Sequence, residues 1–309
     1  MSVIPPVSLK LWESDFAAFA TALGDSFARH GFAVVGDHGL DAARVDAAMA
    51  DARAFFALPE PVKRKYHLPG AAGHRGYTPF AVETAKGAVH ADLKEFWHLG
   101  GESPDGQTRE GTVGNVWPTE APNFRRSQLW LYGALEALGE KLLVAIAVYL
   151  GLDAGYFEGA VARGDNLLRL LHYPPAGFDG PSIRAGAHED IDAITLLLGA
   201  DEAGLQILDK GGAWLPIDPP PGAIVVNVGD MLARLTNDVL PSTTHRVVNP
   251  PPERRGVARY STPFFLQFRP DFLIETLPGC VRADRPNRYP TPITAQDFLA
   301  QRLREIGLA

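Results

Sequence analysis

The chain contains one cysteine, Cys280, among 309 residues. A single thiol excludes a disulfide within the chain and any zinc or iron–sulfur site built from several cysteines. The lack of disulfide-forming pairs favours a cytoplasmic protein. A metal site in this chain must use other ligands, and the nine histidines are the first candidates.

The chain also lacks a basic excess and a long apolar run. Lys and Arg number 29 against 36 for Asp and Glu, which gives a formal net charge of −7. This balance disfavours nucleic acid and anionic membrane surfaces as partners. No apolar stretch is long enough to span a bilayer, and the first ten residues lack the apolar core of a signal peptide. We therefore expect a soluble protein without a nucleic-acid or membrane partner.

The residues that are present favour a globular fold of many short elements. Hydrophobic residues make up 46% and charged residues 21%, while 31 glycines and 26 prolines interrupt the chain. Apolar periodicity predicts a strand over 31–36 and helices over 14–29, 41–57 and 127–151. Residues 67–90 show few periodic signals and predict loops, whereas 92–99 (DLKEFWHL) have a helix-like pattern.

After residue 165 the pattern changes to short apolar runs separated by Gly, Pro and Asp. This spacing is typical of an antiparallel sandwich or barrel. The runs are LLRLLHY, AITLLLG, GLQILD, AIVVNVG, HRVVN and RYSTPFFLQF. No linker marks the change, so we expect one compact unit. In it, residues 1–125 form a mixed helical wrapper, and residues 126–309 form the β region with a C-terminal helix capped by Thr294.

A His-x-Asp pair with a distant histidine is the ligand set of a facial-triad iron site. His188 and Asp190 form such a pair, and His245 lies downstream in HRVVN. Two residues that are two apart on a strand share one face, so both can reach the same ion, and the third ligand comes from another strand. Two imidazoles and one carboxylate on one side of Fe(II) leave the other positions open for a co-substrate and O2.

The chain contains the same pair a second time, as His90-Ala91-Asp92. With nine histidines, one match by chance is expected, so the pair alone is a weak signal. The extended run before His188 and the apolar strand after Asp190 favour the later pair. We interpret His90, His98 and Trp97 as structural.

A second motif supports this choice. Arg259 and Ser261 open the strand RYSTPFFLQF and share one of its faces. An arginine fork beside a hydroxyl suits a buried carboxylate, which the fork binds through two parallel hydrogen bonds. The similar Arg125-Arg126-Ser127 opens a predicted helix and follows no candidate histidine.

Taken in order, these segments resemble the isopenicillin N synthase-like group of Fe(II)/2-oxoglutarate-dependent oxygenases. The similarity runs from LRLLHYPP through AHEDIDAITLLL, GAIVVNVGDML and THRVVNPP to RYSTPFF, and the N-terminal GFAVVGDHGL and RGYTPF…DLKEFWHLG also match. The resemblance implies a mainly β fold with flanking helices, built on a double-stranded β-helix (a cupin-like jelly roll). It also implies bacterial relatives.

Carried over to this chain, the resemblance makes His188, Asp190 and His245 the Fe(II) ligands. Arg259 and Ser261, with help from Tyr173, would hold the distal carboxylate of 2-oxoglutarate. The implied reaction uses O2 to hydroxylate or desaturate a small-molecule substrate, with release of succinate and CO2. One departure is Leu171, where many plant members carry Asn.

Other residues receive weaker interpretations. Arg184 lies four residues before His188 on the same strand face and could meet an anionic substrate. Arg75 and Tyr77 could line the mouth of the site. Asn227 and Asp230 in VNVGD fit a turn after a buried strand. No pattern indicates an oligomeric state or a particular substrate.

Three alternatives remain open on the sequence alone. Isopenicillin N synthase itself resembles this chain but uses the matching Arg and Ser for its substrate and needs no 2-oxoglutarate. A zinc-dependent hydrolase could use the same three ligands, although it has no need for the Arg-x-Ser clamp. A non-catalytic jelly-roll binding protein would be expected to have lost a ligand, and all three are present.

Overall fold

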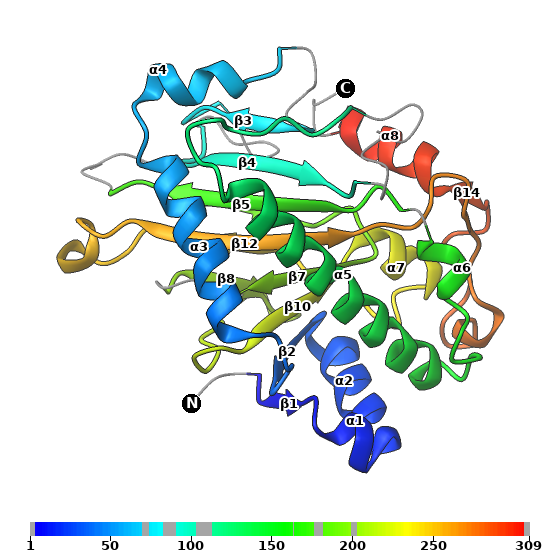
Figure 1. Cartoon of the computed structure of the whole chain (residues 1–309). Helices are drawn as coiled ribbons and strands as arrows, with labels where there is room; N and C mark the ends of the chain where they lie inside the picture. The colour runs from blue at the N-terminus through cyan, green and yellow to red at the C-terminus, as the bar shows by residue number, and fades with distance from the viewer. Residues whose placement is uncertain are drawn as a thin grey trace.

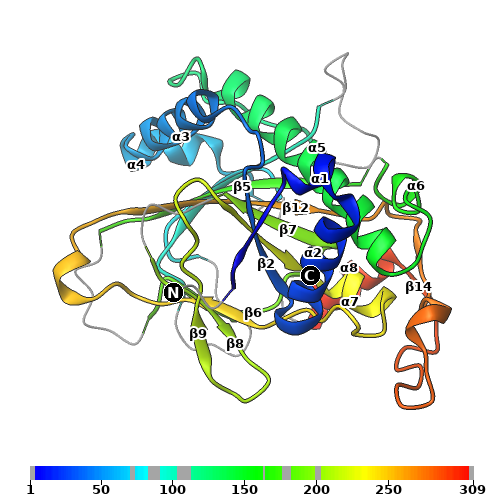
Figure 2. The ribbon, with the colours of Figure 1, turned by 90° about the horizontal axis from the view of Figure 1, so that it is seen from below.

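The fold consists of two stacked β-sheets with helices on the outer side of the larger one (Figures 1 and 2). The structure is a computed structural model and describes residues 4–69, 74–82, 91–102, 113–162, 164–175, 182–198 and 203–305. His90 of the second His-x-Asp pair lies outside these residues. The predicted mainly β fold with a jelly-roll core and flanking helices is confirmed.

The larger sheet has eight strands in the order β1-β2-β10-β7-β12-β5-β4-β3. Every pair is antiparallel except β1–β2. In chain order its strands are β1 (Pro6–Ser8), β2 (Phe32–Gly36), β3 (Gly76–Thr78), β4 (Glu95–Gly100), β5 (Leu167–Tyr173), β7 (Ile194–Leu198), β10 (Ile224–Val228) and β12 (Arg259–Leu266).

The smaller sheet has four strands in the order β6-β11-β8-β9 and lies below the larger sheet in Figure 2. Its strands are β6 (Ala185–His188), β8 (Leu205–Leu208), β9 (Trp214–Pro216) and β11 (His245–Val247). A separate two-stranded sheet pairs β13 (Leu273–Ile274) with β14 (Ile293–Thr294). The apolar runs recognised after residue 165 correspond to β5, β7, β8, β10, β11 and β12.

Helices cover the outer face of the larger sheet, with α3 and α5 crossing its strands in Figure 1. The predicted helices are present as α2 (Phe16–His30), α3 (Ala42–Phe56) and α5 (Phe124–Tyr149). The remaining helices are α1 (Leu11–Ser14), α4 (Glu60–Lys63), α6 (Glu158–Val161), α7 (Asp230–Leu235) and α8 (Ala295–Glu305), with 3-10 turns at Arg64–Tyr66, Pro252–Arg254 and Pro278–Cys280. Among the described helices, none combines the length and the apolar character that crossing a membrane would require.

Helix α5 approaches the sheet closely at Gly139. A Cβ atom there would lie 2.7 Å from Leu266 and 3.3 Å from Leu196, on β12 and β7. The absence of a side chain therefore lets the helix backbone rest directly on the central strands.

Strand alternation separates two faces of the larger sheet, and this decides which residues can reach the site. On the inner face, Leu171 and Tyr173 cluster with Ala185 and Val247 of the smaller sheet. Leu168 and Leu170 point the other way, into the core shared with the helices. Inner residues therefore face the smaller sheet, and outer residues lie beneath the helices.

The helix-like pattern of residues 92–99 was a wrong prediction, because Glu95–Gly100 form strand β4. All six residues of this strand are buried, since its two faces pack against different layers. Trp97 lies in the helix-covered core, whereas Phe96 belongs to the inner cluster. A strand that is apolar on both faces has no clear period of two, so its sequence can mimic a helix.

The first 125 residues contribute strands as well as a covering layer. β2 pairs antiparallel with β10, and β4 pairs antiparallel with β5. The N-terminal region therefore supplies the strands at both edges of the larger sheet.

Candidate metal centre

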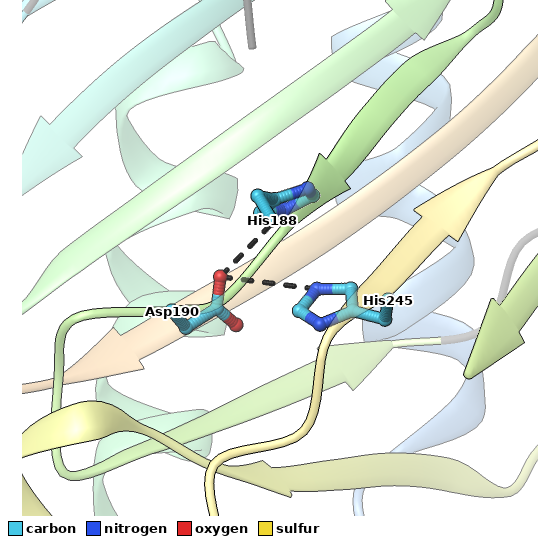
Figure 3. Close-up of side chains that lie close together, drawn as sticks. All are labelled: His188, Asp190 and His245. Carbon is cyan, nitrogen blue, oxygen red and sulfur yellow. Dashed lines mark ion pairs between the residues drawn. The ribbon is translucent and has the colours of Figure 1, made fainter. Parts of the chain in front are cut away.

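Three predicted ligands converge between the two sheets (Figure 3). His188 ends β6, His245 begins β11, and the two residues are directly paired across the strands. Asp190 follows β6, and its Oδ1 lies 3.8 Å from His188 Nε2 and 3.9 Å from His245 Nε2. One donor atom from each residue lies within 4.8 Å of the others. The His-x-Asp spacing and the β6–β11 register together create this triangle.

Backbone carbonyls fix the direction of both imidazoles. His188 Nδ1 donates to Gly186 O at 2.7 Å, and His245 Nδ1 donates to Thr243 O at 3.2 Å. A neutral imidazole with its proton on Nδ1 carries its lone pair on Nε2. Both lone pairs therefore point to the side on which Asp190 lies. Phe32 also packs edge-on against His245, with ring centroids 5.4 Å apart.

The Asp190 carboxylate is held by two donors from the inner face of the larger sheet. Thr195 Oγ1 lies 2.6 Å and Asn227 Nδ2 lies 2.8 Å from Asp190 Oδ2. These bonds occupy one oxygen and orient the other, Oδ1, towards the histidines. Outer hydrogen bonds of this kind orient metal ligands and tune their basicity. Thr195 and Asn227 are themselves cross-strand partners, so one register position supplies both donors.

A second buried carboxyl group, Asp192, shares the Thr195 hydroxyl. Its Oδ2 lies 2.8 Å from Thr195 Oγ1, and its side chain is 1% exposed. Burial and the neighbouring charge of Asp190 raise the pKa of Asp192 well above its ordinary value. The Thr195 hydroxyl therefore lies between two buried carboxyl groups, and the raised pKa of Asp192 reduces the repulsion between them.

The electrostatics of the triad suit a metal cation. Desolvation, and then the neighbouring His245, lower the pKa of His188 to about 4, so its ring is neutral at pH 7. Burial alone would raise the pKa of Asp190, but the two histidines and the two hydrogen bonds hold it below its ordinary value. The centre thus presents the neutral imidazole of His188, the imidazole of His245 and one carboxylate. That donor set fits the facial triad of non-haem Fe(II) enzymes.

The centre is open on one side. The side chain of His188 is 38% exposed, against 9% for Asp190 and 10% for His245. Molecules from solvent can therefore approach the triad past His188, while the other two ligands are shielded.

The other predicted binding motif lies on the inner face of the larger sheet. Arg259 pairs with Tyr173, and Ser261 pairs with Leu171, across β12 and β5. Arg259 Nη1 donates to Ser261 Oγ at 3.0 Å, and the guanidinium carbon lies 5.0 Å from the centroid of the Tyr173 ring. The exposed fractions of these side chains are 1% for Arg259 and 2% for Ser261 and Tyr173. The structure therefore brings the three residues together.

Arg184 lies near the same ring. Its guanidinium carbon is 6.0 Å from the centroid of Tyr173, and its Nη2 donates to Val257 O at 3.2 Å. Only 1% of the residue is exposed. Arg184 is therefore an internal residue that neighbours Arg259.

Tyr77 is not at the mouth of the site, contrary to the prediction. Its cross-strand partner is Trp97, which belongs to the core beneath the helices. The Tyr77 hydroxyl donates to Glu95, and Glu60 Oε2 of α4 lies 3.0 Å from the same hydroxyl oxygen. Alternation places the side chain on the face opposite the metal ligands.

Arg75 is buried beside strand β4 rather than exposed in a loop. Its guanidinium forms an ion pair with Asp165 at 2.9 Å and fills the space where a side chain on Gly100 would lie.

Asp92 of the second His-x-Asp pair has a structural role. Asp92 Oδ1 accepts a hydrogen bond from Gly186 N at 2.9 Å, which links this segment to the ligand strand β6.

The turn interpretation of Asn227 was wrong, and Thr195 and Asp192 were missed. Asn227 lies inside β10, is 4% exposed and contacts Asp190 directly. One signal was present in the sequence, because an amide within the apolar run AIVVNVG must find a hydrogen-bond partner when buried.

We expect Asn227→Ala to weaken metal binding about 10- to 100-fold, the usual effect of removing an outer hydrogen bond from a ligand. Titration of the metal-free protein with Mn(II), followed by calorimetry, measures the change. Asn123→Ala, at an exposed position before α5, is the matched control. Equal metal affinity in both variants would show that the Asn227 bond does not support Asp190.

Comparisons with known proteins agree with this geometry. Residues 4–120 match the model of the non-haem dioxygenase N-terminal region, described for morphine synthesis, and residues 164–268 match that of the 2OG-Fe(II) oxygenase superfamily. The 2-oxoglutarate-Fe(II) type oxidoreductase hxnY of Emericella nidulans is 35% identical over 265 residues. This alignment covers 81% of the present chain and 74% of the relative.

Solved structures of proteins from the same family are also similar to this chain. A crystal structure of a 2OG-Fe(II) oxygenase family protein from Caulobacter crescentus is similar with a TM-score of 0.92 and 58% identity, over 99% of this chain and 100% of the other. A full-length Neurospora crassa protein, crystallised in complex with alpha-KG (2-oxoglutarate), is similar with a TM-score of 0.87 and 29% identity, over 97% and 95% of the two chains.

Proposed function

Because this chain belongs to the 2OG-Fe(II) oxygenase superfamily, we propose the following roles for the residues of its site. Fe(II) binds to His188, Asp190 and His245. The distal carboxylate of 2-oxoglutarate binds to Arg259 and Ser261, next to Tyr173. The substrate is a small molecule, and the enzyme oxidises it with release of succinate and CO2.

The observation that carries the proposal is the Arg259–Ser261 pair. Its guanidinium and hydroxyl are joined by a hydrogen bond and lie on the inner face of the larger sheet, the face that also supports Asp190. A guanidinium fork binds a carboxylate through two parallel hydrogen bonds, and burial strengthens them. The Neurospora crassa structure with alpha-KG supports a 2-oxoglutarate-dependent enzyme over the alternatives that the sequence left open.

The protein's part in the reaction is to hold and orient the reactants. When bound, Fe(II) supplies the chemistry that activates O2 and oxidises an unactivated C–H bond. Asn227 and Thr195 keep Asp190 ionised and correctly turned, and the backbone carbonyls keep both Nε2 atoms available. Arg259 would hold the distal carboxylate of the co-substrate and so restrict its orientation in the site.

We place Arg184 at the co-substrate end rather than at the substrate. It shares the Tyr173 ring with Arg259 and is equally buried. Its positive charge would add to the field that attracts the distal carboxylate.

We expect Arg259→Gln to weaken 2-oxoglutarate binding about 10- to 150-fold, since a hydrogen bond to a charged group contributes about 1.5–3 kcal/mol. Calorimetric titration of 2-oxoglutarate into Mn(II)-loaded protein measures the dissociation constant without a substrate. Metal affinity should not change.

The matched control is Arg125→Gln in the similar Arg-x-Ser motif, whose arginine side chain is 56% exposed and pairs with Glu102. The assignment of Arg259 fails if its variant binds 2-oxoglutarate as the native protein does, or if both variants lose the same affinity.

A further inference from the structure

The two strands that carry the histidine ligands stop pairing at the metal centre. β6 ends at His188 and β11 begins at His245, and these two residues are the terminal pair of their ladder (Figure 3). Residues 189–193 then form no regular element and connect β6 of the smaller sheet to β7 of the larger one. Asp190 lies in this connection. The third ligand is therefore on a segment that the strand ladder does not hold.

A side-chain hydrogen bond extends the pairing by one position beyond the two histidines. In the antiparallel register, the next residues in line are Glu189 and Thr244. The Thr244 hydroxyl donates to Glu189 Oε1 at 2.8 Å. Thr244 is itself fixed to the smaller sheet, because the Leu208 N–H donates to its carbonyl at 2.9 Å. The residue between the two ligands of the His-x-Asp pair is thus joined to the residue that precedes the other histidine ligand.

Helix α8 places a cation beside the same carboxylate. Arg302 Nη2 lies 3.7 Å from Glu189 Oε2, which is an ion-pair contact rather than a hydrogen bond. The two oxygens of Glu189 therefore face different partners, Thr244 and Arg302. The Glu189 side chain is 37% exposed, so water screens its attraction to the guanidinium. A stronger contact elsewhere must hold Arg302 in this position.

Asp230, the first residue of α7, provides that contact. Arg302 Nε and Nη2 each lie 2.9 Å from Asp230 Oδ2, and the Asp230 side chain is 10% exposed. The backbone N–H of Asp230 donates to Asp190 O at 2.8 Å, and that of Met231 donates to Asp192 O at 3.1 Å. The first turn of α7 thus holds the segment that carries the third ligand, and Arg302 holds this turn.

We propose that Glu189 and Arg302 are positioning residues of the metal centre. Glu189 joins the two strand ends that carry the histidines, and Arg302 holds both Glu189 and the turn that binds the Asp190 backbone. The inference rests on the proposed function, because it takes the triad as the Fe(II) site. Ligands that are ordered before the metal binds lose less conformational freedom on binding. Loss of either contact should therefore weaken metal binding although all three ligands remain.

The hydroxyl of Thr244 tests the link between the strand ends. Thr244→Val removes the hydroxyl at nearly constant size and should weaken Mn(II) binding about 2- to 12-fold, the effect of losing one hydrogen bond. Thr244→Ser keeps the hydroxyl and should bind Mn(II) as the native protein does. Calorimetric titration of the metal-free protein measures both. Glu189 is left unchanged, because its charge also acts on the metal directly.

Arg302→Gln tests the contact from α8 and should weaken Mn(II) binding by a similar factor. Arg304→Gln is the matched control, since Arg304 lies on the same helix and is exposed. It should retain native affinity. The visible absorption of bound Co(II) reports the geometry of the ligands, and we expect it to change in Thr244→Val and Arg302→Gln but not in Arg304→Gln or Thr244→Ser.

Urea denaturation of the metal-free variants separates positioning from a purely structural role. The inference is overturned if Thr244→Val and Arg302→Gln keep native Mn(II) affinity and Co(II) absorption, even if they unfold at lower urea concentration. It is also overturned if Thr244→Ser loses as much affinity as Thr244→Val. Native protein that binds neither metal contradicts the proposed function, whereas native metal binding with unaffected variants contradicts only the roles of Glu189 and Arg302.

Discussion

Replacement of His188 with alanine is expected to reduce succinate formation from 2-oxoglutarate to the level of metal-free protein. His188 supplies one of two imidazole nitrogens, and a facial site left with one histidine and one carboxylate holds Fe(II) weakly. The loss of metal affinity should exceed the range of about 10- to 100-fold that follows loss of an outer hydrogen bond. Succinate release and bound iron, measured on the same anaerobically reconstituted sample, check the result.

Asp190→Asn is the companion substitution, because it removes the charge without changing the size of the side chain. The donors Thr195 and Asn227 remain in place, so any loss reflects the carboxylate itself. His30→Gln, at the end of α2, changes a histidine far from the triad in sequence and should leave turnover unchanged. Native turnover in His188→Ala at native iron content would remove His188 from the ligand set.

The second large effect concerns stability and arises on the outer face of the sheet. Glu95 is 3% exposed and forms an ion pair with Lys63 at 2.6 Å, and Lys63 is almost equally buried. His172 donates to the other carboxylate oxygen at 2.6 Å, and Tyr77 donates to the Lys63-bound oxygen. We expect Glu95→Gln to lower the free energy of unfolding by about 3–5 kcal/mol, because Lys63 loses its principal buried counter-charge.

The loss should fall near the lower end of that range, since Lys63 also lies 3.6 Å from Glu60. Urea denaturation measures the difference. Asp271→Asn, in an ion pair whose members are 45% and 78% exposed, is the control and should leave the midpoint nearly unchanged. An equally small effect at Glu95 would mean that the buried pair does not stabilise the fold.

The Glu95–Lys63 ion pair also predicts how the free energy of unfolding changes with pH. Burial alone would raise the pKa of Glu95, but hydrogen bonds from its three donors hold it below the ordinary value of 4.5. A lowered folded-state pKa contributes stability that is present above the unfolded pKa and is lost as the pH falls through the folded value. The difference between native protein and Glu95→Gln should therefore shrink below about pH 4.5.

The residues around Glu95 also support the strands that carry the proposed 2-oxoglutarate site. His172 lies between Leu171 and Tyr173 in β5, and its ring stacks on Tyr260, which lies between Arg259 and Ser261 in β12. The outer residues of these two strands are thus held together directly behind the inner residues assigned to 2-oxoglutarate.

The residues that the chemistry requires were the easiest to predict from sequence. The identities of His188, Asp190 and His245 are dictated by the metal, and the order of the motifs separated them from similar patterns elsewhere. The amphipathic helices were also recognisable, because one face of α2, α3 and α5 is buried and the pattern follows from that.

The residues missed are those whose roles depend on pairing between distant segments. Asn227 supports Asp190 only because β10 aligns it with Thr195 of β7, and no local pattern reveals that register. The position of Tyr77 was likewise unpredictable, since the face to which it points is set by pairing with β4. A shift of one residue in either register would exchange the two faces.

The position of β2 in the larger sheet affects how the protein can fold during its synthesis. Its neighbour β10 is encoded near the other end of the chain, and synthesis of the residues between Gly36 and Ile224 takes roughly 10 to 40 s at ordinary translation rates. During that interval the apolar strand Phe32–Gly36 has emerged from the ribosome without its antiparallel partner. Helix α2, which immediately precedes β2 and packs on it, can cover one face of the strand during this time. The other face and the edge that pairs with β10 stay exposed until β10 has been translated, and an exposed apolar strand edge can pair with other chains.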